Sequence, residues 1–195
     1  KDSAINALYI CSGENPQKVE LTAGQTATVS FHNVLSTGGV KLVKKTNTGE
    51  NLAGWQIGLY YDADCTQPID GSPFLTGADG AITVTDLDPS TLYAKEIPTD
   101  DPYWEFDTEV KEVTIAVNQT ATVTFTNTHY GRIEFRKTTN TGNHLGGWTF
   151  RVMDGNYDVV GEYTTDDNGY ACTENLPLGR YTVIELQTDD LYWNF

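Results

Sequence analysis

The strongest constraint on the fold of this chain is that its sequence repeats. KLVKKTNTGENLAGWQIGLYYD, which begins at Lys41, matches EFRKTTNTGNHLGGWTFRVMD, which begins at Glu134. Two further pairs of segments match: GQTATVSFHN with NQTATVTFTN, and KEIPTDDPYWEF with IELQTDDLYWNF. Self-similarity at a fixed period marks one structural unit that is used several times.

The spacing of the matches gives the length of the unit. Three matched pairs lie 89 to 94 residues apart: Asn33 with Asn127, Lys44 with Lys137, and Glu96 with Glu185. We therefore predict the C-terminal part of a first repeat in 1–36, a complete middle repeat in 38–129 and the N-terminal part of a last repeat in 130–195. The short joints, Ser36–Gly39 and Thr128–Gly131, are expected to be turns.

Alternation of apolar and polar residues predicts strands. In 24–33 and again in 121–127, Ala, Val, Phe and Asn occupy every second position, with Thr or Ser between most of them. This period and this composition are typical of half-buried antiparallel strands, and Gly- and Asp-rich turn signals separate the segments. We expect an all-β fold, with tandem antiparallel β-sandwiches.

Polar residues fall on the apolar side of three strands. A side chain two positions from a core residue shares its face. Lys44 follows Val40 and Leu42 in this way, Glu96 follows Leu92 and Ala94, and Asn127 ends the apolar face of 121–127. The same positions recur in the other repeats as Lys137, Glu185 and Asn33.

Two interpretations of the buried Lys, Glu and Asn remain open. In one, the charged groups reach water at strand ends or form an ordinary salt bridge. In the other, burial favours a neutral Lys44 amine and a protonated Glu96. The amine then attacks the side-chain carbonyl of Asn127 while Glu96 hydrogen-bonds that carbonyl and carries protons, and an isopeptide bond forms as ammonia leaves. No cofactor is needed.

The motifs K-x-T-N-T-G-x-x-L-x-G-W, D-x-N-G-Y followed by LPLGRYTVIE, and the closing V-x-F-x-N resemble the SpaA-like, Cna protein B-type domains of Gram-positive surface proteins and pilins. The resemblance covers essentially the whole chain. It implies a transthyretin-like (prealbumin-like) sandwich, tandem arrays that form stalks or pilus shafts, cell-wall attachment and intramolecular isopeptide bonds.

The resemblance also assigns roles to residues. In the middle repeat it implies a reactive Lys44, a catalytic Glu96 and an acceptor Asn127. In the last repeat Lys137 and Glu185 match the first two roles, with an acceptor expected beyond Phe195. In the first repeat Asn33 matches the acceptor, and the spacing puts Asp2 at the acid position.

Composition and charge exclude other classes. Twelve basic residues against 27 acidic ones, a net charge of -15, argue against binding to nucleic acid or to an anionic membrane surface. The first ten residues lack the pattern of a signal peptide, so we expect a mature or excised fragment. The scattered histidines, His32, His129 and His144, predict no metal site, and three distant cysteines predict no disulfide framework.

We expect a structural stalk module on the bacterial cell surface, attached to the wall through a region outside this chain, and no turnover enzyme. Its partners would be neighbouring repeats, and incomplete repeats would permit head-to-tail self-association. The alternative is an adhesin module that binds a host protein or glycan through exposed aromatic pairs, Tyr103–Trp104 and Tyr192–Trp193. On each pair we expect one anchoring ring and one exposed ring.

Overall fold

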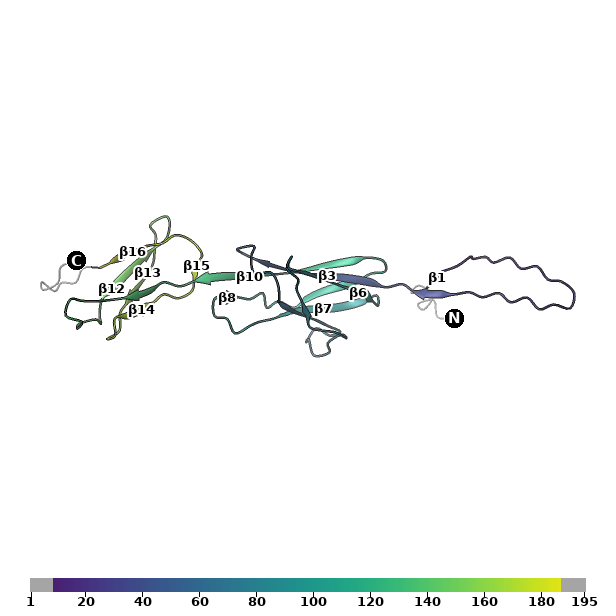
Figure 1. Ribbon diagram of the computed structural model, residues 1–195, viewed down its shortest axis with the longest axis horizontal. Helices are drawn as coiled ribbons and strands as arrows, with labels where there is room; N and C mark the ends of the chain where they lie inside the picture. The colour runs from purple at the N-terminus through teal and green to yellow at the C-terminus, as the bar shows by residue number, and fades with distance from the viewer. Residues whose placement is uncertain (1–8, 187–195) are drawn as a thin grey trace. The chain divides into compact units, whose positions relative to one another are not determined.

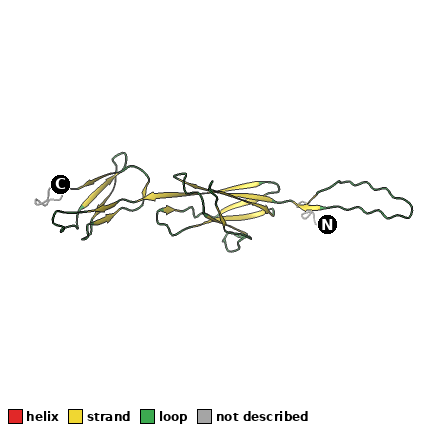
Figure 2. Cartoon of the chain, viewed as in Figure 1, coloured by secondary structure: helices red, strands yellow, loops and turns green. Residues whose placement is uncertain are grey.

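The computed structural model describes residues 9–186, and every regular element in that range is a strand (Figures 1 and 2). The all-β prediction is confirmed. Among the described residues, no helix is long and apolar enough to cross a membrane. The strands are β1 (Tyr9–Cys11), β2 (Asn33–Leu35), β3 (Gly38–Thr46), β4 (Gln56–Tyr60), β5 (Phe74–Leu75), β6 (Ala81–Leu87), β7 (Ser90–Ile97), β8 (Trp104–Glu105), β9 (Lys111–Ile115), β10 (Thr120–Gly131), β11 (Glu134–Arg136), β12 (Thr149–Met153), β13 (Val159–Thr164), β14 (Tyr170–Cys172), β15 (Leu176–Pro177) and β16 (Thr182–Glu185).

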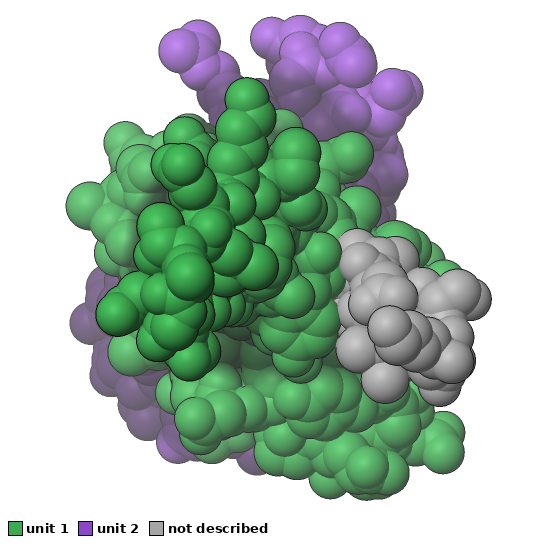
Figure 3. Space-filling model, turned by 90° about the vertical axis from the view of Figure 1, so that its right-hand side faces the viewer, with its two compact units in different colours: residues 1–100, 106–127 green, residues 101–105, 128–195 purple. Residues whose placement is uncertain are grey.

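The chain divides into two compact units, coloured separately in Figure 3. Residues 101–105 and 128–195 form one of them, and the remaining residues form the other. The middle repeat folds as a sandwich of two sheets, with strand orders β5-β4-β7-β9 and β10-β3-β6. Inward side chains of these sheets, together with Ile69 from the loop between β4 and β5, form one apolar core: Val40, Leu42, Ile57, Leu59, Ile69, Leu92, Ala94, Val113, Ile115, Val123 and Phe125.

Most strand pairs are antiparallel, as predicted, but the first and last long strands of the middle repeat, β3 and β10, run in parallel. In their register Phe125 lies opposite Lys44. Asn127 stands two residues beyond Phe125 and therefore shares its face of the sheet. The parallel pairing thus brings the polar ends of both apolar faces to the same end of the core.

The alternating burial of the middle repeat agrees with the predicted faces. Lys44 is buried while its neighbour Lys45 is exposed, and Glu96 is buried on the same face of β7 as Leu92. Asn127 is buried at the end of the alternation in β10. These three polar side chains therefore point into the sandwich.

Three local predictions are wrong, one of a strand and two of turns. The strand expected over 24–33 begins only at Asn33, and the Phe31 side chain remains 58% exposed, because a strand is stable only beside a partner. The joint at Thr128–Gly131 is not a turn. It continues β10, since it pairs with β8 and β15 inside the second unit.

The glycines of the other joint begin β3 instead of forming a turn. A Cβ at Gly38 would collide with the carbonyl oxygen of Ala116, and a Cβ at Gly39 would lie 2.8 Å from the carbonyl oxygen of Val84. Close approach of the backbone, rather than turn geometry, therefore requires glycine at these two positions.

The last repeat has a smaller core. Its sheets, β13-β12-β16 and β11-β14, enclose Phe135, Val152, Ala171 and Leu176. Val183 stands two residues before Glu185 in β16 and so shares its predicted inward face, but it is 40% exposed. The predicted inner face of β16 is therefore only partly covered within the described residues.

Candidate functional site

Backbone contacts that accept only glycine position Lys44 at the end of the core. The N–H of Lys44 donates to the carbonyl oxygen of Gly80 at 2.6 Å. Gly80 has a φ of 76°, and a Cβ there would lie 2.7 Å from the carbonyl oxygen of Lys44. The turn that contains Gly80 can therefore approach β3 this closely only because it lacks a side chain.

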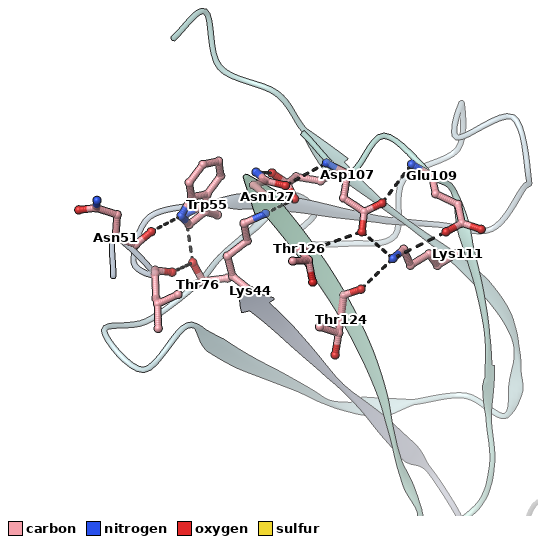
Figure 4. A network of polar contacts seen from close by, with 12 residues as sticks. Lys44, Asn51, Trp55, Thr76, Asp107, Glu109, Lys111, Thr124, Thr126 and Asn127 are labelled. Atoms are coloured by element: carbon pink, nitrogen blue, oxygen red, sulfur yellow. Dashed lines mark hydrogen bonds and ion pairs between the residues drawn. The ribbon is translucent and has the colours of Figure 1, made fainter. Parts of the chain in front are cut away.

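The indole of Trp55 forms one wall around the lysine. The Nζ of Lys44 lies 4.5 Å from the ring centroid, within the range of a cation–π contact. Trp55 Nε1 donates to the carbonyl oxygen of Asn51 at 2.6 Å, and its backbone N–H donates to Thr76 Oγ1 at 3.1 Å (Figure 4). Thr76 Oγ1 in turn donates to the carbonyl oxygen of Leu52 at 2.7 Å, so the loop that holds the ring is fixed at several points.

Glu96 connects the two other polar side chains of the core. Lys44 Nζ donates to its Oε2 at 2.6 Å, and Asn127 Nδ2 donates to its Oε1 at 2.5 Å. The three residues are 0 to 1% exposed. Lys44 and Asn127 come from adjacent strands of one sheet, whereas Glu96 comes from β7 in the other sheet. The structure therefore brings the three predicted residues of the middle repeat together.

The carbonyl oxygen of Asn127 has a different partner from the one expected. The sequence predicts that Glu96 hydrogen-bonds this oxygen, but Glu96 contacts the amide nitrogen instead. Asn127 Oδ1 accepts a hydrogen bond of 2.9 Å from the backbone N–H of Asp107. The reason is geometric, since an N–H donor at this place orients the oxygen of the amide toward itself.

Burial governs the electrostatics of the lysine. Desolvation lowers the pKa of Lys44 below its ordinary value of 10.5, although the hydrogen bond and the charge of Glu96 act in the opposite direction. A lowered pKa increases the fraction of neutral amine, which is the nucleophilic form. The predicted direction of this pKa shift is confirmed.

The last repeat contains the lysine and the acid in the same relation. Lys137 Nζ lies 2.6 Å from Glu185 Oε1 and 3.5 Å from the ring centroid of Trp148. The side chains of Lys137 and Glu185 are 14% and 27% exposed, so this pair is less buried than its counterpart. Asn33 lies in β2 opposite Cys11, on an exposed part of the chain. Asp2 lies outside the described residues.

The remaining candidates have ordinary structural contacts. Trp104 stacks on His129 with ring centroids 4.1 Å apart, and the guanidinium of Arg132 lies 5.2 Å from the ring of Tyr103, which is 40% exposed. The pair Tyr192–Trp193 lies outside the described residues. Within residues 9–186, no group of three or more His, Cys, Asp or Glu side chains has the arrangement of a metal site.

Sequence reasoning did not find Asp107 or Thr76. A signal for Thr76 exists, because Thr76 and Thr165 each precede a repeated glycine by four residues, and Thr165 holds Trp148 as Thr76 holds Trp55. Asp107 carries no comparable signal. Its contact with Asn127 uses a backbone N–H, which every residue except proline has.

A prealbumin-like sandwich with a buried lysine, acid and asparagine at one end of its core defines a class of repeat domain. The sequence matches the family model "SpaA: Prealbumin-like fold domain" over residues 38–129 and 131–194. The chain therefore belongs to the SpaA prealbumin-like fold domain family. No curated protein matches the chain.

Several solved structures are similar to the chain. A streptococcal ancillary pilin is 24% identical, with a TM-score of 0.45, over 91% of this chain and 62% of that one. The Bacillus anthracis TIE protein is 23% identical, with a TM-score of 0.45, over 79% and 29%. The minor pilin GBS52 of Streptococcus agalactiae is 25% identical, with a TM-score of 0.42, over 57% and 58%. The chain thus spans less than two thirds of the length of each.

Proposed function

We propose that this chain is a structural segment of an extracellular stalk or pilus on a bacterial cell surface, and that an isopeptide bond between Lys44 and Asn127 stiffens its middle repeat. The observation that carries the proposal is that the carboxylate of Glu96 contacts both nitrogens between which a proton must pass. Complete burial of the three groups supports a reactive role, because charges without a function are rarely placed in a core.

The reaction follows from these contacts. Nζ of Lys44, as the neutral amine, attacks Cγ of Asn127 and forms the Nζ–Cγ bond. Glu96 accepts the proton that Nζ loses and delivers a proton to Nδ2. The Cγ–Nδ2 bond then breaks and ammonia leaves. The sandwich holds the amine beside the amide, which replaces the effect of a high reactant concentration.

The last and first repeats extend the proposal. Lys137 and Glu185 have the same roles, with an acceptor strand supplied from outside the described residues, and Asn33 is the acceptor of the first repeat. Neighbouring repeats of the same protein are the partners in this arrangement. In one form of it, the incomplete repeats of two chains complete each other, so that the chains associate head to tail. Covalent bonds inside each repeat suit a stalk exposed to shear and proteases, since the three cysteines described here are unpaired.

Intact-mass analysis tests the proposal. The wild-type chain should weigh roughly 17 Da less than its sequence predicts, because one ammonia is lost in the condensation. Fragmentation of a protease digest should find the peptides of Lys44 and Asn127 joined. A Lys44→Ala variant serves as the control and should have the mass predicted from its sequence. An unshifted wild-type mass would contradict the proposal.

The adhesin alternative depends on the aromatic pairs. Trp104 and Tyr103 contact His129 and Arg132 within one unit, which favours an anchoring role for these rings over a free glycan platform. Glycan-array binding that disappears in Trp104→Ala would reverse that preference.

A further inference from the structure

The proposed reaction needs a hydrogen-bond donor to the carbonyl oxygen of Asn127, and Glu96 does not supply it. When Lys44 attacks, the carbonyl oxygen of Asn127 gains negative charge, and a buried oxygen in that state needs a hydrogen-bond donor fixed in place. Both carboxylate oxygens of Glu96 already accept from nitrogens. The donor that contacts the oxygen is the backbone N–H of Asp107, at 2.9 Å.

The N–H of Asp107 lies in an irregular segment between β8 and β9, where no sheet ladder holds it. The side chain of the same residue fixes the segment instead (Figure 4). Asp107 Oδ2 accepts from Lys111 Nζ at 2.7 Å and from the backbone N–H of Thr126 at 3.2 Å. Lys111 Nζ also donates to the carbonyl oxygen of Thr124 at 2.8 Å. The segment is therefore attached to β10 immediately beside Asn127.

The charges of this attachment are well matched. The side chains of Asp107 and Lys111 are 17% and 24% exposed, and Lys111 Nζ lies 4.8 Å from the ring centroid of Phe125. Burial acts to raise the pKa of Asp107, but the hydrogen bonds from Lys111 and Thr126 outweigh it, so the pKa lies below its ordinary value. Asp107 is thus held as a carboxylate.

We propose that the backbone N–H of Asp107 is the oxyanion donor of the crosslinking reaction, and that Asp107 and Lys111 act together as a clamp that aims this N–H at Asn127. The inference rests on the proposed crosslink between Lys44 and Asn127. In this arrangement Glu96 carries protons between Nζ of Lys44 and Nδ2 of Asn127, and the clamp holds the N–H that stabilises the amide oxygen. Lys111 is a positioning residue, since it touches none of the reacting atoms.

The direct test removes the N–H and keeps the side chain. The full chain is synthesised in a cell-free system with the α-hydroxy analogue of aspartate at position 107, so that an ester replaces the amide and the carboxylate of the clamp remains. Translation is stopped, and crosslinking is followed over time by intact mass. Loss of one oxyanion donor should slow the reaction by about 10²- to 10³-fold.

The control is the same ester replacement at Val110, which belongs to the same irregular segment and is 37% exposed. This variant should crosslink at close to the wild-type rate. Circular dichroism verifies that both ester variants fold. If the ester at position 107 leaves the rate unchanged while the wild type crosslinks, the inference is overturned and the proposed function stands. If the wild type does not crosslink, the proposed function fails first.

A second pair of variants tests the clamp. Lys111→Met should slow crosslinking by about 10- to 100-fold, because a small misplacement of a distant group can cost up to ~10² in rate. Lys111→Arg keeps a cation that reaches both Asp107 and Thr124 and should restore most of the rate. A purely structural role predicts instead that Lys111→Met lowers stability without changing the rate at which the folded chain crosslinks, and that result would contradict the clamp.

Discussion

The lysine sites of the middle and last repeats have the same surrounding contacts and differ in how deeply the lysine and the acid are buried. In both, a tryptophan ring contacts the lysine, a threonine hydroxyl accepts from the backbone N–H of that tryptophan, and a glycine with positive φ approaches the lysine backbone. The lysine–acid distance is 2.6 Å in each. In both repeats, these surrounding residues therefore align the lysine with the acid in the same way, independently of the acceptor.

Burial separates the two sites. Lys44 and Glu96 are fully buried, whereas Lys137 and Glu185 remain 14% and 27% exposed. In the middle repeat β10 lies beside β3 and adds Val123, Phe125 and Asn127 to the core. In the described part of the last repeat, β11 pairs with β14 alone. The comparison shows that the last strand contributes desolvation as well as Asn127, the proposed acceptor.

The largest effect is expected from Glu96→Gln, which keeps the size of the side chain and removes the acid. The crosslink should form at least ~10²-fold more slowly, because general acid–base catalysis typically contributes 10²–10⁴. Timed intact-mass measurements follow the loss of ammonia. Glu185→Gln is the matched control and should leave the reaction of the middle repeat unchanged. Equal rates in Glu96→Gln and the wild type would refute the proton-carrying role.

A large effect on stability is expected from Lys44→Met, which prevents the bond without leaving an unpaired cation in the core. The middle repeat should lose about 4–5 kcal/mol of unfolding free energy, the amount expected for a crosslink that closes a loop of this size. Hydrogen exchange followed by mass spectrometry reports this separately for each repeat.

Lys137→Met is the matched control for the last repeat. There we expect a change of about 1 kcal/mol or less, since the ion pair is partly exposed. Similar losses of unfolding free energy in the two repeats would contradict a crosslink that stabilises the middle repeat alone.

An acceptor strand supplied as a separate peptide should complete the Lys137–Glu185 site of the last repeat, as β10 completes the Lys44–Glu96 site of the middle repeat. A peptide with the sequence of residues 118–127, added in excess, should pair beside β11 as β10 pairs beside β3 and slowly form a covalent adduct with Lys137. The adduct should weigh roughly 17 Da less than the sum of its parts, because ammonia leaves. Lys137→Ala should abolish the adduct, and a peptide with Ala in place of its last Asn should form none.

The smallest effect concerns pH. Lys44 faces Glu96 and lies near Asp107 and Lys111, and desolvation is the dominant influence that lowers its pKa. Since the neutral amine is the nucleophile, the crosslinking rate should rise with pH, and the midpoint of the rise should lie below 10.5, the ordinary lysine value. Timed mass measurements over a pH series record the curve. A midpoint at or above pH 10.5 would mean that burial does not lower the pKa of Lys44 during the reaction.

Much of the middle repeat was predictable because alternation in a strand determines which side chains share a face. Lys44, Glu96 and Asn127 each follow apolar residues at a spacing of two, and each proved to be buried. The prediction of a strand over 24–33 was wrong for a related reason. This segment has the same alternation as β10, but alternation predicts a strand only where another strand pairs with it.

The sequence by itself determined the repeat, the all-β class, the inward faces of the middle repeat and the burial of Lys44, Glu96 and Asn127, because these depend on local periodicity and on residue type. Tertiary structure decided that β3 and β10 run in parallel, that Glu96 contacts the two nitrogens, and that Asp107 contacts the amide oxygen. Contacts between distant segments depend on how the sheets pack, and a backbone N–H has no signature in the residue that carries it.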